Sequence, residues 1–389
     1  MNLLMELGLQ LMSLQEQSKP FLYISKLFKT YYSRATIFLP SDLDKREFAF
    51  QPLGKDTYVR HLSFRSEQEV RRYLVENTPA NAFYSSALFL FPHLKDMEQK
   101  VWLGSELLFD IDADALPGCE GTIKNVCLDC GFSYPGIKEC PRCGSKNIVE
   151  AESISQECLS KAANQTIKLI DVLKRDFGFT QITVTFTGNR GFHVRVTCDR
   201  ECMKLSSDER REIASYIKGL GLDLNLLNIP RGGRRERSRY IPHPADGGWR
   251  GRIGWEAYSK YKLDVNKRYT INDLILMGIE FNVDELVKET TIYIDEKVTM
   301  DIHRLVRIPG SLHGKTGLPS IVLSPENLSS FQLSCDISPF KGKTTIIPLV
   351  DLSDITIFDK SIDLKKNEKT TIEHCYAIFL LLRGLARLP

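Results

Sequence analysis

The sequence predicts a mixed fold of the α/β (α+β) class, because strand-like and helix-like segments alternate along most of the chain. Strand-like runs at residues 82–91 and 101–114 precede a helical pattern at 157–176, in which apolar residues recur at helical spacing. A strand, a polar turn and a second strand follow at 182–196, and another strand is expected at 291–295. This order favours a mixed sheet covered by helices.

Further helices are expected near both ends of the chain and in its middle. Residues 1–30 and 66–76 have helical patterns. A serine followed three residues later by a glutamate forms a capping box that predicts a helix over 206–218. An apolar helix around Leu382 is expected to pack either on the core or on a partner protein.

The chain has 389 residues, more than one average domain, so insertions into a large core or a second domain are expected. Changes in composition divide it into five segments. These are a first part of the core at 1–118, a cysteine-rich segment at 119–150, more of the core at 151–200, an inserted helical and basic lobe at 201–290, and the last part of the core with the C-terminal region at 291–389.

Composition and charge are those of an ordinary globular protein, with 42% hydrophobic residues and a net charge of +3. Such a charge is compatible with nucleic-acid binding, which depends on a local basic face. Met1–Leu14 is apolar but carries Glu6 and no basic leader, so an amphipathic helix is expected there, not a secretory signal. Tyr376–Leu382 is too short to span a bilayer. We therefore expect an intracellular, cytoplasmic protein without membrane contact.

Two aspartates close the strand-like run at 101–114. Side chains alternate between the faces of a strand, so Asp110 and Asp112 project together while Phe109 and Ile111 point into the core. Two carboxylates so placed can hold hard divalent cations, which prefer oxygen ligands. The alternative interpretation is a solvated strand end, because the motif is short.

A two-metal site usually needs a third acid. Asp114 follows on the same face but lies past the expected end of the strand. Asp295 ends the strand-like run at 291–295, and Asp301 opens the basic segment that follows. Spacing alone does not choose between Asp295 and Asp301.

The polar turn within residues 182–196 offers donors for phosphate groups. Gly188 and Gly191 let the backbone approach a ligand closely. Arg190 lies in the turn, and His193 shares one face of the next strand with Arg195. A hairpin with a solvated polar face would explain the same pattern.

The segment 301–317 is denser in basic residues. Its cationic or potentially cationic side chains surround a Pro-Gly-Ser turn that contributes the Ser311 hydroxyl; they are Arg304, Arg307, His313 and Lys315. Interleaved apolar residues indicate that the segment is partly buried, and a nucleotide's phosphates would offset the repulsion among its charges. A solvated basic loop is the alternative.

A second basic cluster lies in the expected lobe, at Arg231, Arg234, Arg235, Arg237 and Arg239. Tyr240 and Trp249 follow it and could stack on bases. Contact with a nucleic-acid template and a flexible exposed loop are both consistent with this cluster.

Four cysteines form two C-x-x-C pairs separated by nine residues: Cys127, Cys130, Cys140 and Cys143. Two tight turns that face each other can supply four thiolates in a tetrahedron, which predicts a closed structural zinc site. A disulfide framework is not expected in an intracellular chain of this size. Four scattered residues, Cys198, Cys202, Cys335 and Cys375, are expected to be structural thiols.

Three motifs in this order resemble those of the archaeal and eukaryotic DNA primase small subunit, particularly its archaeal branch. They are LLFDIDAD at 107–114, TGNRGFH at 187–193 and DIHRLVRIPGSLHGKTGL at 301–318, and the third is the most specific. REFAF near Arg46 and YVRHLSF near Arg60 also fit. The resemblance extends from about residue 24 to residue 325.

The resemblance implies a mixed-sheet archaeo-eukaryotic primase catalytic core with an inserted zinc knuckle and an inserted, mainly helical lobe. It implies that Asp295 is the third catalytic acid beside Asp110 and Asp112. The residues that it implies for the incoming nucleotide are Thr187, Arg190, His193, Arg307 and His313, with Ser311 and Lys315 as further candidates.

The activity implied is template-directed synthesis of short RNA or DNA primers on single-stranded DNA from nucleoside triphosphates. Two Mg²⁺ or Mn²⁺ ions would serve catalysis, Zn²⁺ would be structural, and a large regulatory subunit would complete a heterodimer in the replication machinery. Two alternatives remain at this stage: a primase-polymerase that extends primers in repair or damage bypass, and a non-catalytic zinc-containing nucleic-acid binder.

Three features depart from the family pattern. Thr187 stands where serine is common, and Asn189 stands where some relatives have arginine. Many archaeal relatives have a histidine in the zinc set, whereas none lies near these four cysteines. Cys119 or Cys158 could therefore join the zinc site in place of one of the four.

Overall fold

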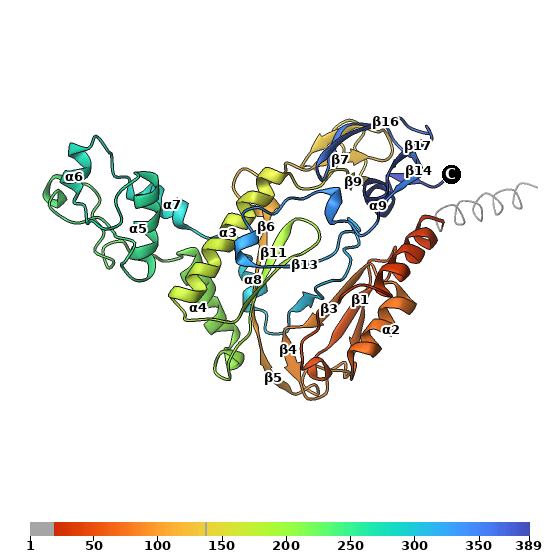
Figure 1. Ribbon diagram of the computed structural model, residues 1–389, viewed down its shortest axis with the longest axis horizontal. Helices are drawn as coiled ribbons and strands as arrows, with labels where there is room; N and C mark the ends of the chain where they lie inside the picture. The colour runs from red at the N-terminus through yellow and green to blue at the C-terminus, as the bar shows by residue number, and fades with distance from the viewer. Residues whose placement is uncertain (1–18, 137) are drawn as a thin grey trace, which may run out of the picture.

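The computed structural model describes residues 19–136 and 138–389 (Figure 1). The amphipathic helix expected at Met1–Leu14 lies outside the described residues. Residues 19–32 are helical, as expected for the later part of 1–30. Helices and antiparallel sheets alternate along the chain, which confirms the predicted mixed α+β class.

Two four-stranded sheets form the centre of the molecule. The first has the order β12-β3-β1-β2 and consists of β12 (Leu305–Arg307), β3 (Asn81–Ser85), β1 (Phe48–Gln51) and β2 (Val59–Leu62). The second has the order β13-β10-β11-β6 and consists of β13 (Ile321–Leu323), β10 (Ile182–Phe186), β11 (Gly191–Val196) and β6 (Leu107–Asp112).

Smaller sheets lie around this centre. Strands β4 (Ala87–Phe89) and β5 (Trp102–Ser105) pair, and the cysteine-rich segment contains β7 (Lys124–Cys127), β8 (Ser133–Pro135) and β9 (Ile148–Glu150). The C-terminal region contains β14 (Lys343–Pro348), β15 (Leu352–Ile357), β16 (Lys360–Leu364), β17 (Thr370–Glu373) and β18 (Ala386–Arg387).

The helices are α2 (Glu67–Asn77), α3 (Gln156–Arg175), α4 (Ser207–Lys218), α5 (Gly248–Lys260), α6 (Ile271–Leu276), α7 (Val283–Thr290), α8 (Glu296–Met300) and α9 (His374–Leu382). The predicted capping box is present, since Ser206 and Glu209 bond reciprocally at the start of α4. Helix α9 packs on the core, because Cys375 through Leu381 are all buried in it.

A large apolar core joins both sheets, and it is built from the inward-facing residues that the strand and helix periodicities predict. Phe109 and Ile111 of β6 are almost fully buried, together with Phe192 and Val194 of β11. Helix α3 packs across β11 and β6, with its buried stripe at helical spacing. The aspartates of β6 are thereby left on the opposite face from this core.

The inserted lobe has a hydrophobic core of its own, which runs from Leu224 to Leu286. Figure 1 shows α5, α6 and α7 set apart from the rest of the chain. Helix α4 contributes Ala214 and Ile217 to the main core. The separate packing of the lobe therefore begins after α4.

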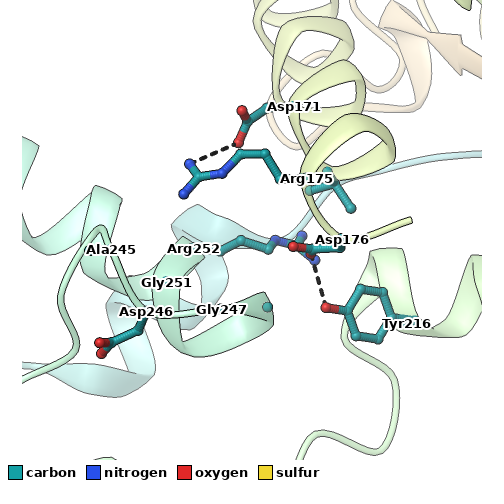
Figure 2. Close-up of a pocket in the computed structure, with 11 residues that line it drawn as sticks. Asp171, Arg175, Asp176, Tyr216, Ala245, Asp246, Gly247, Gly251 and Arg252 are labelled. Atoms are coloured by element: carbon teal, nitrogen blue, oxygen red, sulfur yellow. Dashed lines mark hydrogen bonds and ion pairs between the residues drawn. The ribbon is translucent and has the colours of Figure 1, made fainter. Parts of the chain in front are cut away.

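A hollow of about 350 Å³ lies where the lobe meets α3 and α4 (Figure 2). Tyr216 Oη donates to Asp176 at 2.9 Å on one side of this hollow. The guanidinium of Arg252 lies 3.9 Å from the Trp249 ring centroid and donates to the carbonyl oxygens of Ile217 and Thr290. These contacts fix the lobe to the core at a place remote from the aspartates of β6.

Residues 291–295 do not form the expected strand. They are extended beside β6, and the Asp295 N–H donates to the Asp110 carbonyl at 3.0 Å. The Tyr293 N–H donates to the Gln165 side chain at 3.0 Å instead of to a neighbouring strand. A regular ladder therefore does not form, although the backbone is extended as the sequence pattern indicates.

The expectations of structural thiols and of no disulfide framework are both wrong in this structure, because six cysteines form three disulfides. Cys119 pairs with Cys158, Cys198 with Cys202, and Cys335 with Cys375. The Cα–Cα distances of 5.9, 5.1 and 5.7 Å are those at which disulfides form. Cys119 and Cys158 are therefore partners of each other and not additional zinc ligands.

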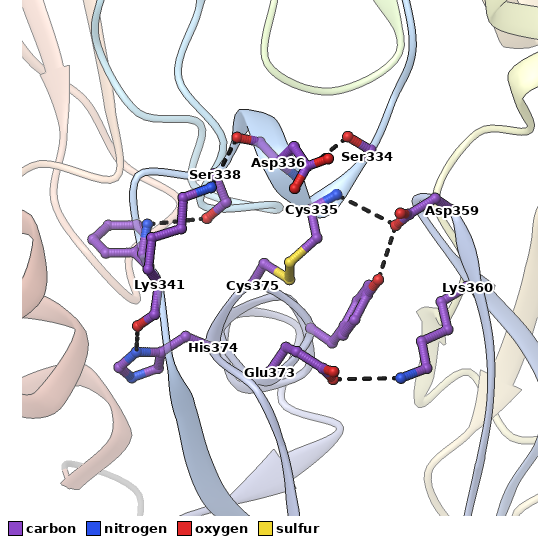
Figure 3. The surroundings of a disulfide bond; sticks show 12 residues. Ser334, Cys335, Asp336, Ser338, Lys341, Asp359, Lys360, Glu373, His374 and Cys375 are labelled. Carbon is purple, nitrogen blue, oxygen red and sulfur yellow. Dashed lines mark hydrogen bonds and ion pairs between the residues drawn. A yellow bond between two sulfur atoms is a disulfide. The ribbon is translucent and has the colours of Figure 1, made fainter.

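Figure 3 shows how the Cys335–Cys375 disulfide connects a loop to the start of α9. Asp359 accepts hydrogen bonds from the Cys335 N–H and from Tyr376 Oη. Glu373 and Lys360 form an ion pair at 3.4 Å beside it. The disulfide and these polar contacts together fix α9 to the C-terminal strands.

Within residues 19–136 and 138–389, no helix combines the length and the apolar character needed to cross a membrane.

Buried ion pairs join the two central sheets. Glu106 lies directly before β6. Its carboxylate pairs with Arg46, two residues before β1 of the first sheet, at 3.0 Å, and with Arg195 of β11 at 3.2 Å. The Glu106 N–H also donates to the Ser86 carbonyl at 3.1 Å. Arg46 is 1% exposed and donates further to Asp42 and to the Ser85 carbonyl. The buried charges of Glu106 and Arg46 keep these partners only while the distance between the two sheets stays the same.

We predict that Arg46→Met lowers the free energy of unfolding by about 3–5 kcal/mol, because it removes one partner of a buried ion pair. Urea denaturation followed by circular dichroism measures this change. The matched control is Lys45→Met, at the exposed neighbouring position. Equal stability of the two variants would contradict a structural role for the ion pair.

Candidate active site

A cleft of about 250 Å³ lies between the two central sheets. Its polar lining residues come from β6, the β10–β11 turn and the segment 304–315: Asp110, Asp112, Thr187, Asn189, Arg190, His193, Arg304, Arg307, His313 and Lys315. Phe83, Leu108, Val298 and Leu305 supply apolar walls. The structure thus brings together residues separated by about two hundred positions in the sequence.

Pairing between β6 and β11 positions the two aspartates. Asp110 is opposite His193, and Asp112 is opposite Gly191. A Cβ atom at Gly191 would lie 2.5 Å from the Ile111 carbonyl oxygen, so only glycine permits this close approach. The two carboxylates consequently project from one face of β6, as the strand alternation predicts.

Both carboxylates are held in a poorly solvated environment. Burial raises the pKa of Asp110 to about 6, and the nearby Asp295 charge adds to the rise. Burial and the charge of Asp110 raise the pKa of Asp112 to about 6. Asp110 Oδ1 is buried and has no hydrogen-bond partner. An unpartnered carboxylate oxygen next to a second carboxylate is a donor set that fits a divalent cation.

His193, which is opposite Asp110, does not supply a positive charge to the Asp110 carboxylate. His193 Nε2 lies 3.6 Å from Asp110 Oδ1, too far for a hydrogen bond. Burial lowers the pKa of His193 to about 4, and the Arg307 charge lowers it further. The imidazole is therefore neutral at neutral pH.

Asp295 lies next to this pair through its backbone, but it does not line the cleft. It is the N-cap of α8, and its carboxylate accepts the Lys297 N–H at 2.9 Å. Asp301, the other candidate, is at the far end of α8 and accepts the His303 N–H. The position beside Asp110 favours Asp295 as the third acid. The sulfur atoms of the four knuckle cysteines lie within 4.8 Å of one another. Among the described residues, the carboxylates of Asp110, Asp112 and Asp295 do not form such a group.

The β10–β11 turn places Thr187, Arg190 and His193 along the cleft. The Thr187 N–H donates to the Gly191 carbonyl at 3.0 Å, and the Arg190 carbonyl accepts the Ala113 N–H at 2.9 Å. The turn is therefore tied to the end of β6. The Arg190 side chain pairs with Asp114 at 2.9 Å.

Arg307 and His313 are buried in the wall of the cleft. Arg307 donates to Asn81 Oδ1 at 2.7 Å and lies over the Phe83 ring, and burial lowers its pKa to about 10. His313 Nδ1 accepts the Lys315 N–H at 3.2 Å. Burial and the Arg307 charge lower the pKa of His313 well below its usual value. Arg307 is therefore the fixed positive charge of this wall.

Ser311 is placed differently from the other predicted residues. Its hydroxyl is buried and donates to the Ile308 carbonyl at 2.6 Å, and Ser311 does not line the cleft. This geometry indicates a role in holding the turn. Its predicted contact with a nucleotide receives no support from these bonds.

The sequence analysis placed Arg304 in the basic segment without assigning it to the site, and it missed Glu150. Arg304 lines the cleft and lowers the pKa of Asp110, against the stronger effect of burial. Glu150, at the end of β9, contacts three cations: Arg190 at 3.5 Å, Lys315 at 3.7 Å and Arg383 at 3.1 Å. No local pattern marks Glu150, because its partners come from three distant segments.

The four cysteines of the knuckle converge. All four sulfur atoms lie within 4.8 Å of one another, with Cys127 Sγ 3.7 Å from Cys143 Sγ and Cys130 Sγ 3.6 Å from Cys140 Sγ. The Cys130 N–H lowers the pKa of Cys127 to about 7, which favours the thiolate that a metal requires. The set fits a structural metal such as zinc.

Comparisons with known proteins show the family to which this chain belongs. A family model described as DNA primase small subunit matches residues 144–325. A DNA primase small subunit of Staphylothermus marinus is 37% identical over 386 residues, which cover 97% of this chain and 97% of the relative. The chain belongs to the DNA primase small-subunit family.

Other members of the family are similar over nearly the same length. The small subunit of Saccharolobus solfataricus is 39% identical over 93% of this chain and 94% of its own. That of Aeropyrum pernix is 36% identical over 92% of this chain and 91% of its own. The similarity includes the lobe and the C-terminal region, for which the sequence motifs had no match. Family membership makes the chain an enzyme of the nucleotidyltransferase class.

Cys140→Ser should lower the bound zinc measured by elemental analysis and lower the melting temperature, because a four-thiolate site loses a ligand. Glu139→Gln, an exposed change in the same knuckle, is the control. Unchanged zinc content in Cys140→Ser would exclude this residue from the ligand set.

A pH effect on stability follows from the raised pKa values of Asp110 and Asp112. Protonation removes the buried negative charges of the two carboxylates. The free energy of unfolding of the metal-free protein should therefore increase as the pH falls through about 6 and decrease as the pH rises through it. Chemical denaturation between pH 5 and pH 7.5 without Mg²⁺ or Mn²⁺ measures the trend. The double variant Asp110→Asn/Asp112→Asn should lack this pH-dependent change in stability, whereas Asp44→Asn should retain it. Parallel curves for all three proteins would contradict the assignment.

Proposed function

We propose that this chain is the catalytic subunit of a DNA primase, which synthesises short RNA or DNA primers on single-stranded DNA by nucleotidyl transfer. The observation that carries the proposal is the cleft in which two carboxylates of raised pKa face a cluster of cationic side chains. The acids suit divalent cations, and the cations suit the triphosphate of an incoming nucleotide.

Asp110 and Asp112 would hold Mg²⁺ or Mn²⁺, with Asp295 as the third acid. When bound, two such ions stabilise charge on the attacking and leaving oxygens of a phosphoryl transfer. The unpartnered Asp110 Oδ1 supports this assignment. Zn²⁺ would be held by the four knuckle cysteines and would be structural.

The cationic residues bind and orient the triphosphate. Arg307 is a buried guanidinium already oriented by Asn81 and Phe83, so it presents a fixed charge to a phosphate. Lys315 and Arg190 are more exposed than Arg307 and supply further positive charge to the cleft. His193 and His313 are neutral and can donate or accept a hydrogen bond without adding charge.

Catalysis in this arrangement rests on positioning and electrostatics. The aligned 3′-hydroxyl attacks the α-phosphate, and pyrophosphate leaves on the side of the basic residues. Thr187 offers a hydroxyl along the same wall. A large regulatory subunit, a single-stranded DNA template and the replication machinery of the cytoplasm complete the proposal, since the relatives bear the name of a small subunit.

Primer synthesis on single-stranded DNA with labelled nucleotides and Mn²⁺ or Mg²⁺ tests this function. Wild type should form template-dependent products without a supplied primer, with or without the large subunit. Asp110→Asn should lower the rate by at least about 10²-fold, because a charge needed in the transition state is removed. Asp44→Asn, which removes an exposed carboxylate, should have wild-type activity. Full activity of Asp110→Asn in a folded protein would contradict the proposal.

A further inference from the structure

A second polar pocket, of about 310 Å³, adjoins the catalytic cleft on the side of the cysteine knuckle. Its lining residues come from the knuckle and from the cleft: Asp114, Gly121, Ile123, Asn125, Gly136, Lys138, Lys146, Ile148, Glu150 and Arg190. Arg190 lines both hollows, so the two lie on either side of its side chain. Apart from Arg190, none of the residues that line this pocket belongs to the proposed nucleotide or metal site.

The pocket has an excess of uncompensated positive charge. Its acids are already paired, because Asp114 contacts Arg190 at 2.9 Å and Glu150 contacts the buried Arg383 at 3.1 Å. Lys138 and Lys146 are exposed, and neither forms an ion pair within the described part of the chain. Two free ammonium groups at the rim of a pocket attract an anion.

Two glycines among the lining residues of the pocket let two chain segments pack closely together. Gly121 and Gly136 face each other there with positive φ angles of 64° and 71°. A Cβ atom at Gly136 would lie 3.1 Å from the Gly121 carbonyl oxygen. This close packing fixes the wall of the pocket two residues before Lys138.

The same knuckle carries an exposed aromatic residue beside another cation. Phe132 is 37% exposed, and the Arg142 guanidinium lies 6.0 Å from its ring centroid. Arg142 is exposed and forms no ion pair in the described residues. Exposed aromatic rings combined with free cations are the features that single-stranded nucleic acids bind.

We propose that this pocket, with Lys138 and Lys146, binds backbone phosphates of a nucleic-acid strand next to the catalytic cleft. The inference rests on the proposed function and deepens it by naming where the strand is held. Arg190 lies between the two hollows, so the strand's phosphates and the nucleotide's phosphates are held on either side of one guanidinium. The knuckle then has a binding role in addition to its structural one.

The test compares the full-length double variant Lys138→Ala/Lys146→Ala with wild type by fluorescence anisotropy on a labelled thymidine homopolymer. Binding should weaken, and the slope of log affinity against log salt should become shallower by about 0.7 per lost phosphate contact, or about 1.4 for both lysines. The control is Lys29→Ala/Lys288→Ala, which removes two exposed lysines elsewhere and should keep the wild-type slope. Melting temperature and zinc content establish that each variant is folded, and Lys138→Gln/Lys146→Gln replaces the alanine variant if that one does not fold.

Two DNA ligands distinguish the strands. Weaker binding of the unprimed oligonucleotide assigns the pocket to the template, and weaker binding only of a primed template assigns it to the primer. Wild-type affinity and slope with both ligands would overturn the inference, as would a loss confined to nucleoside triphosphate affinity. The Asp110→Asn measurement is independent, because DNA affinity requires no catalysis. Failure of either proposal can therefore be recognised separately.

Discussion

The candidate active-site cleft depends on the buried charge of Glu106, which joins the two central sheets. Its carboxylate is shared by Arg46 and Arg195, and its carbonyl accepts the Arg210 guanidinium at 3.0 Å. A buried carboxylate is tolerated only while such partners surround it. The distance between the sheets is consequently fixed one residue before β6 begins, and the cleft that carries Asp110 and Asp112 lies between those sheets.

The cleft contains two groups of opposite charge, one acidic and one basic. Burial raises the pKa of both acids on β6, and the charge of Asp110 raises the pKa of Asp112 further. Arg304, Arg307 and Lys315 line the same cleft. Burying the acidic group or the basic group alone would cost free energy, because burial penalises uncompensated charge. In the proposed function, a nucleotide triphosphate with divalent cations would supply positive charge to the acids and negative charge to the basic residues. The proposal therefore assigns to this site a metal–nucleotide complex and not either component separately.

The sequence predicts the local parts of this site well and its long-range connections poorly. Alternation along residues 107–112 places both aspartates on one face, and the cysteine spacing predicts the convergence of four sulfur atoms, because both depend on neighbouring residues only. The role of Glu150 depends on Arg190, Lys315 and Arg383, which only the tertiary fold brings together. The disulfides were missed for the same reason, since two of the three join residues about forty positions apart. Residues 291–295 have the composition of a strand, but the Tyr293 N–H donates to the Gln165 side-chain oxygen in place of a ladder bond.

Crystals of the protein grown with Mn²⁺ and a nucleoside triphosphate would test the central claim most directly, through the anomalous scattering of manganese. The account predicts manganese peaks at the carboxylates of Asp110 and Asp112, with the triphosphate between them and Arg307. Manganese bound away from these carboxylates, or a triphosphate outside the cleft, would contradict it.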